Sequence, residues 1–266
     1  MKLFIALALG TALLFQGCQR SGGGAIEIAG STSVSPLMEL LAAEYERTHP
    51  ETRININGTG SSDGIRAAAD GTAQLGMSSR DLSPTERGQG LNEQVIALDG
   101  IAIILHPSSP IDNLTIEQIH AVYSGEITDW SQLTPEKSGG IAVVSREPGS
   151  GTRGAFEELI NLRTLVSGGT EFDGTGAVRA TISRNPSAIG YISVGSVDNS
   201  VKAVSIEGVY ATAANVRNGT YRIARPFLVL SRDNLSNEGK EFLSWIMGPD
   251  GQNIVSRNWI AVAYYQ

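Results

Sequence analysis

Small hydroxyl side chains and glycines occur together in three short segments of the chain. These segments are Gly30–Ser33, Gly58–Ser62 and Gly149–Thr152. At such turns, backbone N–H groups and hydroxyls can both donate to an anion, because glycine lets an anion oxygen approach the main chain. Arg146 precedes Ser150 by four residues, and its planar guanidinium can hold two oxygens of one anion. The pattern predicts a binding site for a small, fully desolvated oxyanion.

Each segment lies between a strand pattern and a helix pattern. Ala25–Ala29 and Arg53–Asn57 alternate, and Ile141–Val144 is uniformly apolar, as expected of strands. A helical pattern follows each turn and begins at Pro36 after the first one. A helix N-terminus exposes unpaired N–H groups and carries about half a positive charge, which favours an anion. The simpler alternative is that Ser and Thr only cap these helices, which is their commonest role. Three turns of one kind beside an arginine favour the anion site.

The composition restricts the classes of function. The chain has 266 residues, of which 41% are hydrophobic and 18% charged, so it can form a sizeable core and is not disordered. Its 20 Lys and Arg against 27 Asp and Glu give a net charge of -7 without a basic run, which argues against a nucleic-acid-binding surface. A single cysteine and three histidines without metal-ligand spacing predict no disulfide, no metal site and no cofactor.

The N-terminus has the features of a secretory signal. A short positive start precedes an apolar run over Leu3–Phe15, which is too short for a permanent membrane-spanning helix of about 20 residues. The segment resembles a bacterial lipoprotein signal, which implies that residues 1–17 are removed as a signal peptide and that Cys18 is lipidated. Residues 18–24 are polar and glycine-rich, and they suit a flexible tether. The alternative is an ordinary signal peptide followed by an incidental cysteine.

Four segments together resemble the ligand loops of a known family. They are similar, in the family's order, to the loops of the phosphate-binding proteins of bacterial phosphate-specific ABC transporters. The four segments are Gly30–Pro36, Gly58–Ser62, Gly76–Arg80 and Arg146–Thr152. Further similarity runs through Leu114–Trp130, Ala188–Tyr191 and Phe242–Val255. The resemblance therefore covers nearly the whole chain after the tether.

The resemblance implies a set of ligand contacts in these loops. Thr32 would donate its hydroxyl, Ser33 its backbone N–H, and Ser61 both kinds of group. Arg146 begins a match to the family's Arg-x-x-x-Ser-Gly-Thr loop, which implies one charge-assisted pair and a helix N-terminal cradle. The full predicted ligand-binding set is Ser31, Thr32, Ser33, Ser61, Ser79, Arg80, Arg146, Ser150, Gly151 and Thr152.

Three positions depart from the family's pattern or leave a contact open. Ser79 stands where the best-known members have an aspartate that accepts a hydrogen bond from protonated phosphate and repels sulfate. Pro148 replaces an acid that pairs with the binding arginine in those members, and Glu147 is a candidate substitute. Arg80 could add a second positive group to the site, or it could be a surface arginine paired with Asp81.

The resemblance implies an α/β fold of the type II periplasmic binding class, in which two lobes close over a ligand. The apolar segments Ile101–Leu105 and Arg222–Leu230 are suited to cross between the lobes. The predicted boundaries are 25–100 and 226–266 for lobe one, and 101–225 for lobe two with the crossing strands. The first three ligand loops would then lie in lobe one and the fourth in lobe two. A ligand that contacts both lobes would stabilise the closed form.

These observations predict a lipid-anchored, monomeric protein outside the cytoplasmic membrane that captures inorganic phosphate and delivers it to an ABC permease. It would be a binding protein without catalytic residues. Two alternatives stay open: the same fold tuned to another tetrahedral oxyanion such as sulfate, and a phosphate sensor or surface interaction protein without transport. Gly60–Gly64 also matches the Gly-x-Ser-x-Gly turn of serine hydrolases, but nothing in the sequence marks His106 or His120 as the base that Ser62 would need.

Overall fold

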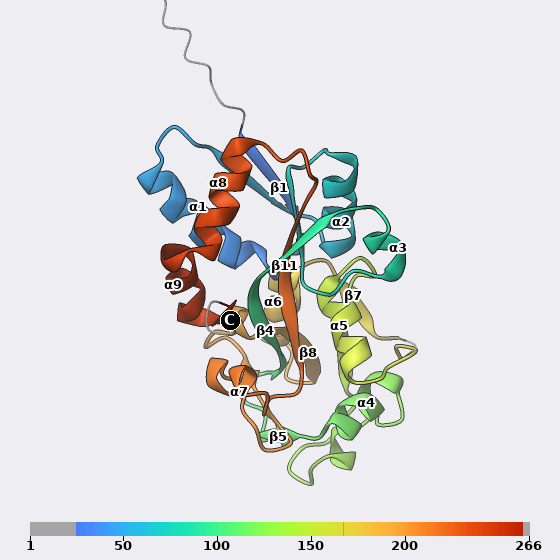
Figure 1. Ribbon diagram of the computed structural model, residues 1–266. Coiled ribbons are helices and arrows are strands. Elements are labelled where there is room, and N and C mark those ends of the chain that lie inside the picture. The colour runs from blue at the N-terminus through green and yellow to red at the C-terminus, as the bar shows by residue number, and fades with distance from the viewer. Residues whose placement is uncertain (1–24, 167, 263–266) are drawn as a thin grey trace, which may run out of the picture.

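A mixed sheet runs through the molecule, and helices flank it on both sides (Figure 1). The computed structural model describes residues 25–166 and 168–262. The predicted signal peptide, the tether and the lipidation site at Cys18 lie outside these described residues. Within the described ranges, no helix is long and apolar enough to cross a membrane.

Among the described residues, the main sheet has ten strands in the order β2-β1-β3-β11-β4-β8-β6-β7, with β9 and β12 also paired to β4. The same ranges include a two-stranded sheet of β10 and β5. The strands are β1 (Ile26–Gly30), β2 (Ile54–Gly58), β3 (Leu75–Ser78), β4 (Asn92–Leu105), β5 (Asn113–Leu114), β6 (Ala142–Arg146), β7 (Thr170–Phe172), β8 (Ala188–Ser193), β9 (Lys202–Ala203), β10 (Ser205–Ile206), β11 (Ala224–Ser231) and β12 (Ile260–Ala261).

Helices follow most of the parallel strands, because a parallel pair needs a crossover connection. Pro36 lies in the first turn of α1, where its missing N–H leaves no hydrogen bond unmade. A capping box of Thr115 and Gln118 begins α4, and Gly125 ends it in the left-handed conformation. The helices are α1 (Ser35–Thr48), α2 (Ser61–Asp70), α3 (Pro84–Arg87), α4 (Ile116–Ser124), α5 (Gly151–Leu159), α6 (Thr175–Ile182), α7 (Ala213–Arg217), α8 (Asn237–Met247) and α9 (Pro249–Asn258), with short 3-10 helices η1 (Trp130–Gln132) and η2 (Val194–Ser196).

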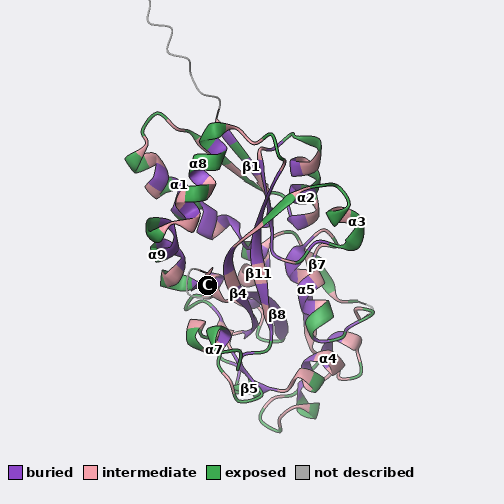
Figure 2. Cartoon of the chain, viewed as in Figure 1, coloured by how far each residue is buried: buried purple, intermediate pink, exposed green. Residues whose placement is uncertain are grey.

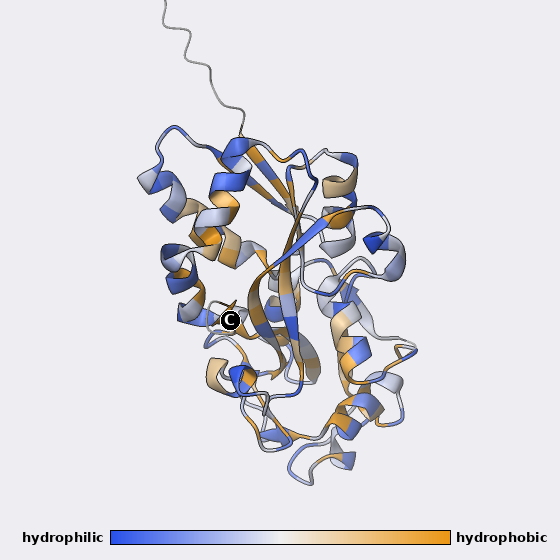
Figure 3. Cartoon of the chain, viewed as in Figure 1, coloured by the Kyte–Doolittle hydropathy of each residue, from blue (hydrophilic) through white to orange (hydrophobic). Residues whose placement is uncertain are grey.

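Strand β4, 14 residues long, joins two halves of the molecule. Its first part pairs antiparallel with β11, up to Gly100 opposite Ala224. Its last part, Ile101–Leu105, pairs with β8. The predicted crossing segments overlap β4 and β11, but β4 begins earlier than the apolar run indicated. Its first residues are polar and exposed, so hydropathy does not mark them as strand (Figure 3).

Among the described residues, the buried apolar side chains form separate clusters on the two sides of this crossing. The terminal half contains β1–β3, α1–α3, α8 and α9, and Tyr45 packs there against Phe242 with ring centroids 4.9 Å apart. The middle half contains α4–α7 and β5–β10, and Phe156 stacks there on Tyr191 at 3.9 Å. Figure 2 shows most of the central strands buried, and the exposed residues at the start of β4, on the loops and on the outer turns of the helices. The lobe boundaries at residues 100 and 226 stay a prediction.

Helix α2 lies very close to the sheet at Gly64. An ideal Cβ at this position would be 2.5 Å from Gly30 Cα and 2.8 Å from the Met77 carbonyl oxygen, and both are backbone atoms. This approach presses the first turns of α2 onto β1 and β3. It therefore brings Ser61, the first residue of α2, next to the ends of those strands.

We expect Gly64→Ala to lower the free energy of unfolding by about 1–3 kcal/mol, because the added methyl group overpacks the contact between α2 and the sheet. Gly176→Ala is the matched control, since Gly176 also lies in a helix and its Cβ would meet no atom within 4 Å. The control should be neutral or stabilising by up to about 1 kcal/mol. Chemical denaturation of both variants measures the difference, and equal stabilities would contradict the close approach.

Candidate anion-binding site

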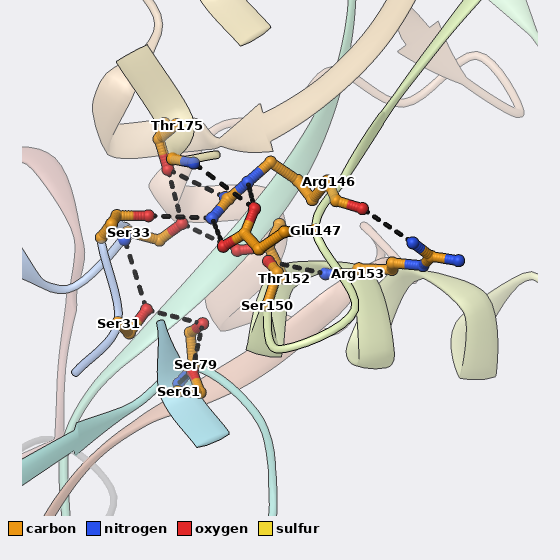
Figure 4. Close-up of polar contacts among 12 residues, drawn as sticks. Ser31, Ser33, Ser61, Ser79, Arg146, Glu147, Ser150, Thr152, Arg153 and Thr175 are labelled. Atoms are coloured by element: carbon orange, nitrogen blue, oxygen red, sulfur yellow. Dashed lines mark hydrogen bonds and ion pairs between the residues drawn. The ribbon is translucent and has the colours of Figure 1, made fainter. Parts of the chain in front are cut away.

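The predicted loops come together where the two halves of the molecule meet. The carboxyl ends of β1, β2, β3, β6 and β7 lead to this place, and α1, α2, α5 and α6 begin there (Figures 1 and 4). Of the predicted set, Ser33, Ser61, Ser79 and Arg146 are almost completely buried. The side chains thus form an interior cluster rather than an open surface.

In the terminal half, three serines bond to one another. Ser31 donates its hydroxyl to Ser79 Oγ at 2.8 Å, and the Ser79 N–H donates to Ser61 Oγ at 3.1 Å. The hydroxyl oxygens of Ser61 and Ser79 are 3.4 Å apart. Each hydroxyl can both donate and accept, so it can exchange a bond to its neighbour for a bond to an anion oxygen. We call Ser31, Ser61 and Ser79 the serine cluster.

A second set of hydroxyls joins the two halves. Ser33 Oγ, in the terminal half, is 2.7 Å from Thr152 Oγ1 and 2.9 Å from Thr175 Oγ1. The two threonines lie in the first turns of α5 and α6, in the middle half. Across the same boundary, the Ser62 N–H donates to the Gly149 carbonyl at 3.1 Å. Short polar contacts at the site itself therefore hold the halves together.

Arg146 is the charged group of this site, 1% exposed at the end of β6. Its Nε and Nη2 donate to the Glu147 carboxylate at 2.8 and 2.7 Å, so Glu147 is the acid that pairs with it. On the adjacent edge, which shares Nη2, Nη1 donates to Thr175 Oγ1 at 3.2 Å and Nη2 to Thr32 Oγ1 at 2.9 Å. This edge can present two N–H groups to one anion, while Glu147 balances the charge from the other side.

Tyr191 and Arg153 fix the main chain of Arg146. The Arg146 N–H donates to the Tyr191 phenol oxygen at 3.3 Å, and Ser145 Oγ is 2.8 Å from the same oxygen. Arg153 Nη1 donates to the Arg146 carbonyl at 2.9 Å. Burial raises the pKa of Tyr191 to about 12, so this residue stays a neutral phenol near physiological pH. Contacts within the protein therefore fix the main chain from which the Arg146 side chain extends.

The helices at the site differ in how their first N–H groups are satisfied. Ser150 caps α5 by accepting from the Arg153 N–H at 3.2 Å, so the capping alternative holds for this hydroxyl. Helices α1, α2 and α6 have no side-chain cap. The caps of α2 and α6 are Gly60 and Gly174, at φ of 98° and 81°, which glycine adopts without strain. These helix ends direct positive dipole ends toward the site.

Arg80 has partners outside the serine cluster. Its guanidinium donates to both carboxylate oxygens of Glu86 at 2.8 Å and to Ser62 Oγ at 3.2 Å. Asp81 contributes its backbone carbonyl, at 2.9 Å, rather than its carboxylate. The hydrogen bonds from Arg80 lower the pKa of Glu86 to about 2. Arg80 therefore lies at the rim of the site, and a direct contact with the ligand stays a prediction.

Thr175 and Gly174 contribute to the site although the sequence-based set omits them. Thr175 bonds to both Ser33 and Arg146, and the Gly174 N–H donates to Glu147 Oε2 at 3.4 Å. The segment Asp173–Gly176 is a further glycine-containing turn, and its hydroxyl, that of Thr175, begins α6. Only three residues of β7 precede it, so the strand pattern that marked the other turns is too short to recognise here.

A second buried arginine adjoins the serine cluster. Arg225 on β11 donates from Nε and Nη2 to Asp99 Oδ2 on β4, at 3.2 and 3.1 Å, and from Nη1 to the Ser79 carbonyl at 3.2 Å. Ser193 donates its hydroxyl to Asp99 Oδ1 at 2.7 Å. Burial raises the pKa of Asp99 and lowers the pKa of Arg225, against the attraction between the two charges. Sequence reasoning missed this pair, whose partners are 126 residues apart.

The contacts of Ser62 do not support the serine hydrolase alternative. Its hydroxyl accepts from Arg80. His106 is hydrogen-bonded to Ser108, and His120 faces the Ile160 carbonyl. Among the hydrogen bonds of the described residues, no histidine reaches Ser62, so this serine has no base beside it.

Fold and site together define the class of protein. The strand order, the two halves and the polar site between them make a two-lobed α/β binding protein of the type II periplasmic fold. In agreement, the family model for a PBP superfamily domain matches residues 19–250.

Similar proteins narrow the class to one family. A substrate-binding protein named for a phosphate ABC transporter of Clostridium perfringens, solved with bound phosphate, is 43% identical, with 90% of this chain and 100% of that chain covered and a TM-score of 0.87. An ABC-type phosphate transport receptor from Vibrio cholerae is 36% identical over 88% of this chain and 99% of that chain, with a TM-score of 0.72. The phosphate-binding protein PstS of Borreliella burgdorferi is 26% identical over 95% of both chains. The chain belongs to the family of phosphate ABC transporter substrate-binding proteins.

Gly151 is the point where the middle half comes closest to the serine cluster. An ideal Cβ on Gly151 would lie 2.8 Å from Ser61 Cβ and 2.8 Å from Ser79 Oγ. Real side chains do not approach so closely, so any larger residue would hold the halves apart. Closure of the site thus depends on a glycine at this position.

We expect Gly151→Ala to weaken binding of a tetrahedral oxyanion by about 10- to 100-fold, which corresponds to an overpacking cost of about 1–3 kcal/mol in the closed form. Gly149→Ala is the control from the same loop, because its Cβ would lie 3.9 Å from the nearest atom, Ser62 Cβ. Titration calorimetry with phosphate and sulfate as probes compares the two variants. Wild-type affinity in Gly151→Ala would show that closure does not need this contact.

Proposed function

We propose that this protein binds inorganic phosphate outside the cytoplasmic membrane and delivers it to the permease of an ABC transporter. The observation that carries the proposal is the edge of the buried Arg146 guanidinium that faces hydroxyls of both halves. The family supports it, since similar proteins named for phosphate binding or transport share this fold. The protein acts by binding alone, without a chemical step of its own.

The proposed phosphate lies between Arg146 and the hydroxyls that now bond to one another. Two of its oxygens accept from Nη1 and Nη2 of Arg146, in place of Thr175 and Thr32. The threonine hydroxyls then turn and donate to the anion, as does Ser33. Because Glu147 already balances the charge of Arg146, helix N-termini and hydroxyl dipoles balance most of the ligand's charge.

Binding and closure are coupled in this proposal. An anion held by Ser33 and the serine cluster on one side, and by Arg146 and Thr152 on the other, stabilises the closed arrangement that a permease can distinguish from the open one. One chain supplies both sides of the site, so the protein works as a monomer. A lipid on Cys18 would keep it at the membrane surface within reach of the permease.

Sulfate is the second candidate ligand, and Ser79 is the observation that favours it. The Ser79 hydroxyl bonds to Ser31 and lies near Ser61, so this part of the site is neutral. A hydroxyl can accept a hydrogen bond from protonated phosphate, but it can equally donate one to sulfate. A carboxylate in that place would accept only. Selection of phosphate then depends on the arrangement of the hydroxyl network as a whole.

Calorimetric titration of the ligand-stripped protein tests the proposal. We expect tight binding of phosphate and little heat with sulfate, from mildly acidic to mildly alkaline pH. A phosphate affinity that changes little over this range would show that neutral hydroxyls accept the phosphate proton as readily as they donate to the dianion. If both anions give comparable heats, or only sulfate gives heat, the anion-binding site stands but its assignment to phosphate is overturned.

Arg146→Ala should weaken phosphate binding by about 2–5 kcal/mol, because it removes the charged partner of a buried anion. The phosphate affinity of Arg146→Lys should lie between those of Arg146→Ala and the wild type, since a lysine keeps the charge but lacks the paired N–H donors of the guanidinium. Arg47→Ala is the control, because Arg47 is exposed and pairs with Glu44 on α1. Calorimetry measures the phosphate affinity of all three variants. An unchanged affinity in Arg146→Ala would mean that a group other than Arg146 balances the charge of the anion.

A further inference from the structure

We propose that Arg225 is a positioning residue of the anion site, acting through the Ser79 carbonyl without touching the ligand itself. The affinity measurements that test this inference rest on the proposed function, whereas the measurement of amide exchange does not. Arg225 lies on β11 directly opposite Asp99 on β4, at the point where the two strands pass between the halves. Its side chain is 2% exposed, and that of Asp99 is 1% exposed, so neither charge is compensated by solvent.

The N–H, the hydroxyl and the carbonyl of Ser79 are all hydrogen-bonded, and the hydroxyl lies near Ser61 as well as Ser31. The N–H donates to Ser61, the hydroxyl accepts from Ser31, and the carbonyl accepts from Arg225 Nη1 at 3.2 Å. Of these bonds, the one from the guanidinium is charge-assisted, and such bonds are about twice as strong as neutral ones. Arg225 therefore contributes most to the orientation of this residue. The direction of the Ser79 hydroxyl toward the anion depends on it.

Asp99 holds Arg225 in the orientation that reaches Ser79. The Asp99 carboxylate takes the Nε and Nη2 edge of the guanidinium, which leaves Nη1 directed at the Ser79 carbonyl. The carboxylate is itself fixed by the hydroxyl of Ser193, which ends β8 in the middle half. The chain of contacts thus runs from the middle half through the crossing strands to the anion site.

Arg225→Lys tests the proposal without removing the buried charge. A lysine ammonium has no rigid fork and cannot hold Asp99 and the Ser79 carbonyl in this geometry. We expect phosphate affinity to fall by about tenfold or more, the effect of losing one hydrogen bond to a charged group. Tyr221→Phe is the control for a purely structural effect, because the Tyr221 hydroxyl donates to the Ile101 carbonyl at the same crossing, at 2.7 Å. Its affinity should equal that of the wild type.

A double-mutant cycle with Ser79→Ala separates positioning from general destabilisation. If Arg225 acts through Ser79, the double variant Arg225→Lys with Ser79→Ala binds phosphate no more weakly than the weaker single variant. If the two single variants each weaken phosphate binding and their fold-losses multiply in the double variant, the proposal is overturned. A folded Arg225→Lys variant that binds phosphate with wild-type affinity would overturn it as well.

Amide hydrogen exchange at Ser79 gives a readout that needs no ligand. In the anion-free protein, Arg225→Lys should speed exchange of the Ser79 N–H by about tenfold, while Tyr221→Phe leaves it unchanged. An unchanged exchange rate in Arg225→Lys would overturn the positioning role whatever the protein binds. If the wild type fails to bind phosphate, the proposed function fails, and the exchange rates still decide the role of Arg225.

Discussion

Burial of the Arg146 guanidinium is the constraint on which the rest of the site depends. A buried charge without partners costs several kcal/mol, so every N–H direction of this side chain needs an acceptor or a ligand. The Glu147 carboxylate takes the Nε and Nη2 edge, and the Nη1 and Nη2 edge bonds to the hydroxyls of Thr175 in α6 and of Thr32 in the turn before α1. These demands explain why glycine-containing turns converge here, since only closely packed turns can bring hydroxyls of both halves to one guanidinium. In the proposed complex only the threonine hydroxyls turn, and the guanidinium keeps the orientation that these contacts give it.

The parts of the fold and site that sequence reasoning could predict are local ones. A strand, a glycine-containing hydroxyl turn and a helix follow one another within about 20 residues, so β1 with α1, β2 with α2 and β6 with α5 were predictable as units. Arg146 was recognisable because it lies four residues before the α5 cap Ser150. The two-lobed fold followed from the order of these units through a family resemblance. Propensity alone would not have given the strand order.

The parts that could not be predicted depend on residues far apart in the chain. Thr175 reaches Ser33 across 142 positions, and Arg225 pairs with Asp99 across 126. No local pattern marks such partners, because tertiary packing brings them together. For Arg80, even the choice between acidic partners close in sequence could not be predicted. Its carboxylate partner is Glu86, six residues on, rather than the adjacent Asp81, because the turn into α3 presents Glu86 to the guanidinium.

Both described ends of the chain belong to the terminal half, so the middle half is an insertion within it. This topology orders events during synthesis. A ribosome makes every strand of the middle half before it makes β11, α8 and α9. The middle half can therefore complete its core while the terminal half still lacks these three elements. Until β11 emerges, β3 and the first part of β4 lack the strand that lies between them. Open strand edges pair readily with other chains, and the interval before residue 224 is therefore when the nascent chain is most exposed to aggregation.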